Sequence, residues 1–309
     1  MKRVNLVCPS LVFSSFAYVA RITRTWIELL DTATVKQPVQ VALSTGYAHG
    51  WLNIRIDDLA LTLRDAKPCD VAWLDTALMT DRVHPRVKSN PARIYTCSKW
   101  DREKAMSKGV KVLDVIPRPF SPLAYKFRNW WRNKKYDFCI IGWFDKPDRK
   151  NFEAMSKVVE RLNAKAVAIT NYNGCWRRLD FSSVDDLLKF ELIAKSKYLL
   201  HLSGSEGFGM PVLEAMAVGV PVVYLDRPAH NEFAVGVEVP VKEIVKLRHR
   251  LGVIESAVVD VDVAVEVAKQ ALDLYGRDDY EEMSKVACLT ADAMLAEFLR
   301  WIRSIVFGE

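Results

Sequence analysis

The chain has 309 residues, half of them hydrophobic, which suffices for two domains of ordinary size and excludes an intrinsically disordered protein. Forty-four Lys and Arg against 38 Asp and Glu give a net charge of +6. That mild excess fits a phosphate-bearing ligand or an anionic surface without requiring nucleic acid. No apolar run reaches the length of about eighteen residues that a membrane-spanning helix needs.

The first segment, Met1–Cys8, carries Lys2 and Arg3 before a short apolar run that Pro9 interrupts. A secretory signal peptide needs a longer apolar core and a small-residue cleavage site, so we expect a β-strand here. The six cysteines lie far apart without a C-x-x-C pair, and most occur within apolar runs. This pattern favours buried free thiols over a zinc site or a disulfide framework, and a cytoplasmic location.

Apolar runs typical of β-strands alternate with helix-like stretches along the chain. The strand candidates are Val4–Cys8, Val39–Ser44, Val71–Leu74, Arg93–Cys97, Phe138–Ile141, Ala166–Thr170, Tyr198–Leu202 and Val220–Leu225. Helical periodicity predicts one amphipathic helix over residues 16–30 and another from Phe152 to Leu162, with Asn151 as its N-cap. A final helix has its apolar stripe between Ala287 and Ile305. Repeated strand–helix units predict parallel sheets covered by helices.

The segment Ile116–Pro122 contains three prolines, which can continue neither a helix nor a central strand. We therefore expect the break between the two halves of the chain here. The basic and aromatic run Tyr125–Lys135 follows, with Trp130 and Trp131 among its Lys and Arg residues. Such a run could contact an anionic membrane or nucleic acid, but we favour a linker whose tryptophans pack under a domain.

The most informative segment, Tyr198–Asp226, reads as strand, glycine loop, short helix and strand. Pro211 suits the first position of the helix and Gly219 the C-terminal cap. Gly207 and Gly209 allow a tight turn close to a ligand. The helix N-terminus presents unpaired N–H groups and a partial positive charge, which a phosphate matches.

Two carboxylates, Glu206 and Glu214, flank this predicted anion site. Both would repel a phosphate, so they make sense when the ligand also offers hydroxyl groups, because an ionised carboxylate accepts hydrogen bonds in a fixed geometry. A nucleoside diphosphate sugar offers a diphosphate, a ribose diol and a sugar ring. The segment therefore predicts a site for a nucleotide-sugar donor.

The residues from Glu206 to Val223 resemble the E-G-F-G-x-P-x-x-E-A-M-A-x-G-x-P-V-V segment of retaining glycosyltransferases of family 4. The resemblance implies that Glu214, the second acid of this Glu-x7-Glu motif, holds the ribose, and that Glu206 lies against the transferred sugar. It also implies that sugar and phosphate are lined by the backbone of Gly207, Phe208, Gly209 and Met210.

A second segment, Ile140–Asn151, is similar to the family's diphosphate-binding segment, which contains an Arg and a Lys. Lys150 falls at the lysine position, and Trp143 stands where the arginine is expected. Arg149 is a candidate for the missing charge, although Arg149 and Lys150 could also be solvated loop residues. A third match, within Ile94–Pro117, resembles the family's domain join.

The resemblance implies an α/β protein of the GT-B fold, with two Rossmann-like domains facing across a cleft and a C-terminal helix crossing back to the N-terminal domain. We expect an acceptor domain over residues 1–118, a donor domain over 119–285 and the returning helix over 286–309. The implied reaction moves a sugar, as in a hexosyltransferase, from a UDP or GDP sugar to an acceptor hydroxyl. Retention at the anomeric carbon is implied, with no metal and no cofactor besides the donor substrate.

The acceptor side is less defined. The N-terminal half is short for the family and has Ser14 and Ser15 near the place of a glycine pair. A family histidine near the β-phosphate has no secure counterpart, and the candidates are His49 and His84, either of which could be an ordinary loop residue. The acceptor is left open among lipid, glycan, protein and nucleic acid, and so is peripheral membrane contact through Tyr125–Lys135.

Two other functions remain open: a nucleotide-sugar epimerase or hydrolase of the same fold, and a non-catalytic sugar- or nucleic-acid-binding protein. The glycine loop at Gly207 and Gly209 does not match the dinucleotide-binding fingerprint, because Val212 occupies the position of its third glycine. The pair Asp260 and Asp262 imitates a metal-binding D-x-D, but its alternating valines favour a solvated strand or helix face. His201, within an apolar strand, is expected to be a satisfied core histidine.

Overall fold

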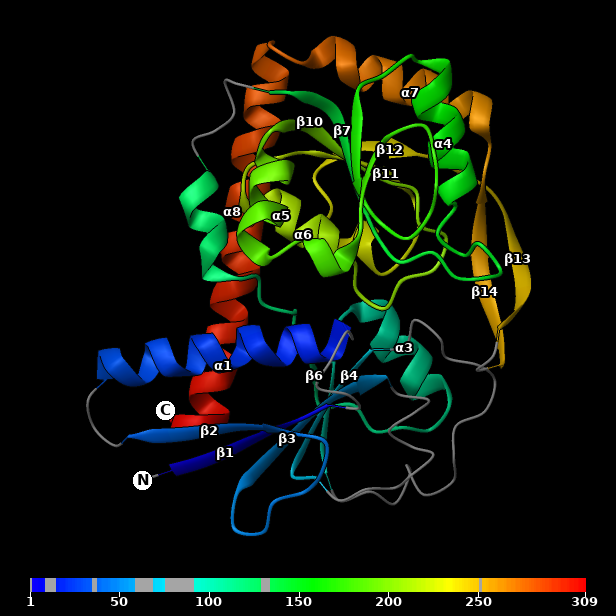
Figure 1. Ribbon diagram of the computed structural model, residues 1–309. Helices are drawn as coiled ribbons and strands as arrows, with labels where there is room; N and C mark the ends of the chain where they lie inside the picture. Colours follow the sequence, from blue (N-terminus) through cyan, green and yellow to red (C-terminus); the bar gives the residue numbers. More distant parts are fainter. Residues whose placement is uncertain are drawn as a thin grey trace. The chain divides into compact units, whose positions relative to one another are not determined.

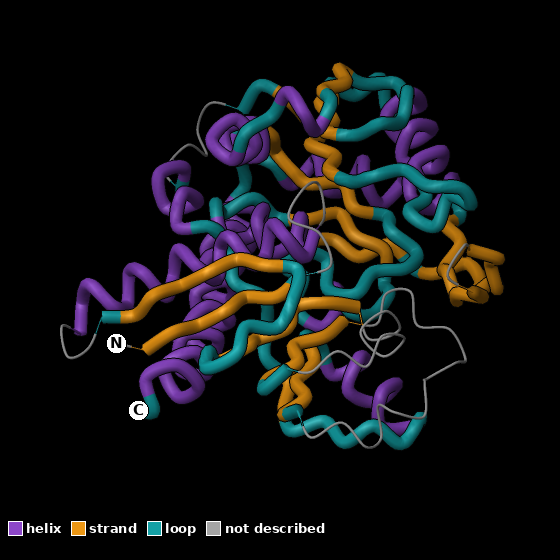
Figure 2. The backbone as a smooth tube through the Cα atoms, turned by 60° about the horizontal axis from the view of Figure 1, so that its bottom comes forward, coloured by secondary structure: helices purple, strands orange, loops and turns teal. Residues whose placement is uncertain are grey.

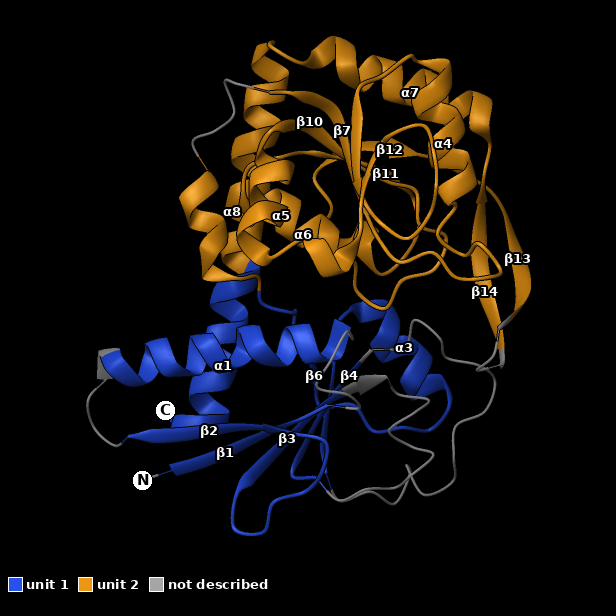
Figure 3. Cartoon of the chain, in the orientation of Figure 1, with its two compact units in different colours: residues 1–119, 294–309 blue, residues 120–293 orange. Residues whose placement is uncertain are grey.

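The computed structural model describes residues 2–8, 15–34, 38–58, 69–75, 92–128, 134–249 and 252–309. The chain forms two compact units: Met1–Pro119 with Met294–Glu309 make unit 1, and Phe120–Ala293 make unit 2 (Figure 3). Each unit contains one parallel six-stranded sheet flanked by helices (Figures 1 and 2). The expected α/β architecture of two Rossmann-like units is confirmed, while the boundaries at residues 118 and 285 stay predictions.

Unit 1 has the strand order β2-β1-β3-β4-β5-β6, and all neighbouring strands are parallel. The strands are β1 (Lys2–Val7), β2 (Val39–Ser44), β3 (Leu52–Asp58), β4 (Val71–Asp75), β5 (Arg93–Thr96) and β6 (Asp114–Val115). The helical segments are α1 (Ser15–Thr34), α3 (Lys99–Ser107), the C-terminal end of α8 (Asp278–Ile302) and the π-helical turn η5 (Arg303–Phe307). The predicted stripe of α1 is buried at Val19, Ala20 and Ile27.

Unit 2 has the strand order β12-β11-β10-β7-β8-β9, again parallel throughout. The strands are β7 (Tyr136–Ile141), β8 (Ala166–Ile169), β9 (Arg177–Leu179), β10 (Ser196–His201), β11 (Val222–Leu225) and β12 (Gly236–Val239). The helices are α4 (Phe152–Arg161), α5 (Asp186–Ala194), α6 (Met210–Ala217), α7 (Val261–Leu274) and most of α8. Three short 3₁₀ helices are η2 (Pro122–Phe127), η3 (Phe181–Ser183) and η4 (His230–Glu232). A separate antiparallel hairpin consists of β13 (Val241–His249) and β14 (Gly252–Val259).

All eight predicted strands are present, each within two residues of its expected bounds. The sequence interpretation missed β3, β6, β9, β12 and the hairpin. These strands are short or carry charged residues, as in the Lys-Glu-Ile-Val-Lys-Leu-Arg run of β13, so their apolar signal is weak. Their backbone pairing, which the sequence does not display, makes them strands.

The C-terminal end of α8 is fixed in the core of unit 1 by aromatic packing. Trp73 on β4 is fully buried and stacks on Phe298, with 5.6 Å between ring centroids. Trp301 lies 5.1 Å from the same indole, whose Nε1 donates a hydrogen bond to the carbonyl of Ile116 at 2.9 Å. The guanidinium of Arg118 covers the ring at 4.5 Å. The expected return of the C-terminal helix to the N-terminal unit is thus confirmed.

The run Tyr125–Lys135 is described only in part, because residues 129–133, which include both tryptophans, lie outside the described ranges. Arg128 forms two hydrogen bonds to the carboxylate of Asp292, at 2.8 and 2.7 Å. Lys134 donates to a backbone carbonyl at the end of α5 at 2.8 Å. These two cations are engaged within unit 2, which supports the linker interpretation, and membrane contact stays a prediction. Among the described helices, none combines the length and the apolar character needed to cross a bilayer.

We predict that Phe298→Ala lowers the free energy of unfolding by about 3–5 kcal/mol, because it removes a fully buried ring that stacks on Trp73. The matched control is Leu289→Ala on the same helix, where the side chain is 68% exposed and the change should stay within about 0.5 kcal/mol. Urea unfolding followed by circular dichroism measures both. Equal losses in the two variants would contradict this packing.

Candidate functional site

The loop between β10 and α6 combines a left-handed backbone bend with free hydrogen-bond donors. Gly209 has a φ of 97°, and a Cβ at this position would lie 2.6 Å from the Cβ of His230. Among the hydrogen bonds of the described residues, none uses the backbone N–H groups of Gly207, Phe208 and Met210. Such donors at the positive end of a helix favour an anion.

Helix α6 has the predicted local signals. Pro211 lies in its first turn, where a missing N–H costs no helical hydrogen bond. Gly219 follows the helix with a φ of 76° and donates to the carbonyl of Met216 at 2.9 Å. The sequence therefore predicted both ends of this helix to within one residue, because the helix begins at Met210 and its C-cap is Val218.

Glu206 in the loop is largely buried and forms an ion pair with Lys150. Lys150 Nζ lies 2.8 Å from Glu206 Oε1, and the two side chains are only 12% and 11% exposed. Burial alone would raise the pKa of the Glu206 carboxyl, but the charges of Lys150 and Arg149 hold it well below its usual range. Glu206 is therefore ionised at neutral pH and accepts hydrogen bonds.

Arg149 forms hydrogen bonds with the backbone of the same loop. Its guanidinium donates to the carbonyl of Ser205 at 2.7 Å and to the carboxylate of Asp145 at 3.2 Å. Its own carbonyl accepts the N–H of Gly204 at 3.0 Å. The structure thus brings Arg149, Lys150 and Glu206 together, with Arg149 bound to backbone and Lys150 bound to the acid.

Asn151 has a different role from the predicted one. It occupies the N-cap position of α4, but its side chain makes no capping hydrogen bond. Its amide instead donates to the carbonyls of Leu202, at 2.8 Å, and Ala257, at 2.9 Å, and so ties the β7–α4 loop to the end of β10. Asp148 Oδ2 accepts the N–H of Glu153 at 3.0 Å and supplies a cap in its place. The Asn151 side chain thus binds two buried carbonyls instead of capping the helix, and the local sequence does not reveal these distant partners.

Two buried histidines lie behind Glu206. The rings of His201 and His230 are 4.9 Å apart and perpendicular, and His201 Nε2 lies 3.5 Å from Glu206 Oε1. Within the described chain, His201 Nε2 has no hydrogen-bond partner, so the expected satisfied core histidine is buried but not satisfied. His230 was missed by the sequence analysis, because nothing in the sequence around it signals burial.

Glu214 is also buried, but it belongs to a second ion pair. Lys189 on α5 places Nζ 2.7 Å from Glu214 Oε1, and the Glu214 side chain is only 3% exposed. The same ammonium lies 3.2 Å from Asp186. Lys189 was missed by the sequence analysis, since it lies 25 residues before Glu214 and only the packing of α5 on α6 brings the two together.

The remaining candidates have separate positions. Phe208 is buried and stacks on Phe233 with 4.8 Å between ring centroids. His49 is exposed in the turn between β2 and β3 of unit 1, and His84 lies outside the described residues. Asp260 caps α7 by accepting the N–H groups of two residues of its first turn, so the D-x-D pair is a helix start. No cluster of metal-ligating side chains occurs among the described residues.

We predict that Gly209→Ala destabilises the protein more than Gly276→Ala. Both glycines have left-handed backbones, with φ values of 97° and 86°, so both variants lose about 1–2 kcal/mol to strain. Only Gly209 has a neighbour within reach, the Cβ of His230, whereas nothing lies within 4 Å at Gly276. Gly209→Ala should therefore lose at least about 1 kcal/mol more in urea unfolding. Losses of the same size would show that the loop has room for a methyl group.

We also predict a stability loss on acidification. Burial lowers the pKa of His201 to about 3 and that of His230 to about 4, from 6.5. Both remain neutral in the folded protein near pH 5, while the unfolded chain binds protons there. The contribution of these neutral histidines to the free energy of unfolding should be fully present above about pH 6.5. It should decrease as the pH drops, by up to about 1.4 kcal/mol per pH unit for each histidine.

Urea unfolding between about pH 7 and pH 5 measures this dependence. His201→Gln should reduce the slope of the unfolding free energy against pH by up to the equivalent of one proton. A wild-type slope in His201→Gln would mean that His201 titrates in the folded protein as it does in the unfolded chain.

Curated relatives of this chain come from archaeal viruses. Two proteins of Sulfolobus islandicus filamentous virus (isolate Iceland/Hveragerdi), assigned by inference as glycosyltransferases 41 and 63, are each 28% identical to it. The first match covers 76% of this chain and 71% of the relative, the second 54% and 60%. ORF330 of Acidianus filamentous virus 2 (isolate Italy/Pozzuoli), assigned likewise, is 29% identical over 41% of this chain and 44% of the relative. The chain thus spans less than two thirds of glycosyltransferase 63 and of ORF330.

Solved structures share the fold over the whole chain. WaaG, a glycosyltransferase involved in lipopolysaccharide biosynthesis, superposes with a TM-score of 0.60 at 12% identity, and both chains are covered completely. Anabaena HepE, solved in complex with UDP and glucose, superposes with a TM-score of 0.61 at 13% identity, again with complete coverage. Residues 87–236, which include the glycine loop, α6 and both ion pairs, match the family described as glycosyl transferases group 1. The match to this family thus spans just under half of the chain, and the chain has the GT-B fold.

Proposed function

We propose that this protein is a retaining, metal-independent glycosyltransferase that moves a hexose from a UDP or GDP sugar to an acceptor hydroxyl. The observation that carries the proposal is the buried pair of Lys150 and Glu206, at 2.8 Å, beside free N–H groups at the start of α6. Diphosphate and sugar would meet there, because the cation and the N–H groups match phosphate while the carboxylate matches hydroxyl groups. The family match over residues 87–236 and the shared fold with HepE support this class of donor.

Glu206 would bind the sugar as a hydrogen-bond acceptor. Its lowered pKa keeps it ionised, so it is unsuited to act as a general acid near neutral pH. Lys150 holds Oε1, which leaves Oε2 available for sugar hydroxyls. In this proposal Lys150 orients the acid before the donor binds.

The departing diphosphate would be stabilised by Lys150, by the loop N–H groups and by the N-terminus of α6. Such donors, held in place before the reaction, favour the charge that develops as the glycosidic bond breaks. Arg149 would act indirectly, since its guanidinium is bound to Ser205 and Asp145 and keeps the loop backbone in place. We therefore assign Arg149 a positioning role and Lys150 the direct contact.

Glu214 would hold the ribose diol. Lys189 binds its Oε1 at 2.7 Å, which neutralises a buried charge. The carboxylate is thereby fixed in one orientation before the nucleotide arrives. Unit 1, where the family motifs are weakest, would bind the acceptor substrate.

We predict that Glu214→Ala weakens binding of UDP or GDP by about 10- to 150-fold, since a hydrogen bond to a charged group contributes about 1.5–3 kcal/mol. Isothermal titration calorimetry measures the affinity, and circular dichroism confirms that the variant is folded. Glu191→Ala on α5 is the control, because this acid pairs with Lys195 at the end of the same helix, and the variant should leave the affinity unchanged.

Transfer is then measured with the nucleotide sugar that stabilises the protein most against heat. Steady turnover of donor without acceptor would favour a hydrolase or epimerase over a transferase. Nucleotide affinity that survives in folded Glu214→Ala would refute the ribose assignment. A protein that binds no nucleoside diphosphate would refute the proposed function as a whole.

A further inference from the structure

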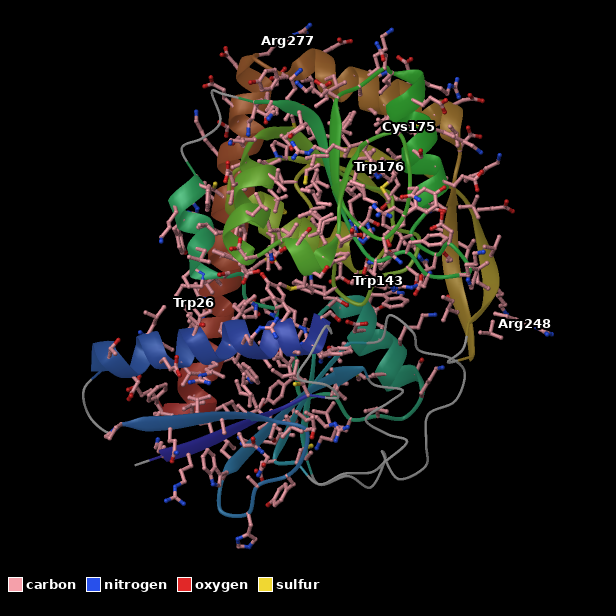
Figure 4. All side chains as sticks on the ribbon, viewed as in Figure 1. Trp26, Trp143, Cys175, Trp176, Arg248 and Arg277 are labelled. Atoms are coloured by element: carbon pink, nitrogen blue, oxygen red, sulfur yellow. The ribbon has the colours of Figure 1, made fainter. Side chains whose placement is uncertain are left out.

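Trp143, directly after β7, is unusual in its exposure. Its side chain is 57% exposed, and every other tryptophan in the described ranges is buried or half-buried. Figure 4 shows the labelled side chain in unit 2, apart from the half-buried Trp176. Ligands of open parallel sheets bind at the carboxyl edge of the sheet, so an exposed indole at this edge is a candidate ligand contact.

The backbone around Trp143 is held firmly on both sides. Gly142 donates its N–H to the carbonyl of Ile169 at 3.1 Å. Asn171 accepts the N–H of Phe144 at 2.6 Å and donates to the carbonyl of Phe144 at 2.9 Å. The indole is therefore attached to an ordered loop, so the stacking of a ligand on it would cost the protein little conformational entropy.

Trp143 borders the predicted diphosphate site. A Cβ on Gly142 would lie 3.5 Å from Cδ and 3.7 Å from Nζ of Lys150. The Lys150 side chain thus passes over the residue that precedes Trp143 on its way to Glu206. An anion bound by Lys150 would lie within the length of a nucleotide from the indole.

Phe181, which packs against Trp143, lies in the segment that leads to α5, the helix whose Lys189 binds the predicted ribose acid Glu214. Phe181 pairs with Trp143 at 5.8 Å between centroids and an interplanar angle of 41°. Phe181 opens η3, and the segment continues into α5, where Lys189 binds Glu214 at 2.7 Å. The two aromatic residues are therefore linked on one side to the diphosphate lysine and on the other to the ribose acid.

The strand order separates this pair from the acid assigned to the transferred sugar. Glu206 follows β10, whereas Trp143 follows β7 and Phe181 follows β9, so the ring pair extends along the sheet edge away from β10. The base, which is joined to the ribose, is the part of the donor that lies away from the sugar. We propose that Trp143 and Phe181 form the stacking site for the nucleobase of the donor, an inference that rests on the proposed function.

Stacking is tolerant of the base, because every base has a π-face, so this site would supply affinity for nucleotides in general. The test compares native protein, Trp143→Ala and Trp143→Phe by calorimetry with UDP, GDP and inorganic pyrophosphate. Trp143→Ala should weaken UDP and GDP by about 5- to 100-fold and leave pyrophosphate unchanged, while Trp143→Phe should retain most of the affinity. Because Trp143 is exposed, the variant should fold normally.

The control is Ile244→Ala, which removes an exposed apolar side chain from the hairpin of the same unit and should change none of the affinities. Equal weakening of nucleotides and pyrophosphate would overturn the inference, because Trp143 would then act on the diphosphate. Unchanged nucleotide affinity with slower transfer would also overturn it, in favour of contact with the sugar or the acceptor. Native protein that binds pyrophosphate but no nucleotide would refute the proposed function and the inference together.

Discussion

The ion pair between Lys150 and Glu206 is the interaction on which the rest of the site depends. Both charges are largely withdrawn from water, which costs several kcal/mol for each ion unless the partner is present. The pair therefore holds the β7–α4 loop against the glycine loop and keeps the acid ionised. Loss of either partner would leave a buried charge without compensation.

A set of hydrogen bonds to the backbone supports that pair. Asn151 ties the first loop to the end of β10, and the guanidinium of Arg149 holds the carbonyl of Ser205. Gly209 makes the bend that directs the start of α6 toward the same place, with His230 packed where a side chain would be. The free N–H groups, the cation and the acid thus occupy one ordered edge of a single sheet, which is the arrangement that anionic ligands of parallel sheets require.

Much of this arrangement could be predicted from the sequence, because its signals are local. The alternation of apolar runs predicted eight of the twelve strands of the two sheets, and Pro211 and Gly219 predicted the ends of α6 to within one residue. The motif from Glu206 to Glu214 marked the loop and both acids. The hairpin β13–β14 escaped prediction because its residues alternate with charges. Asn151 occupies the predicted N-cap position, but the partners of its side chain could not be predicted because they lie far away in the chain.

By itself, the sequence determined the alternation of strands and helices, the glycine bend, the two acids and the resemblance to a glycosyltransferase family. These follow from local periodicity, backbone preferences and spacing, all of which can be read along the chain. Only the tertiary structure decided the partners: Lys150 for Glu206, Lys189 for Glu214, and Phe181 for Trp143. Each of these pairs joins residues on different elements, and the pairing of strands and the packing of helices, which depend on the whole chain, bring them together.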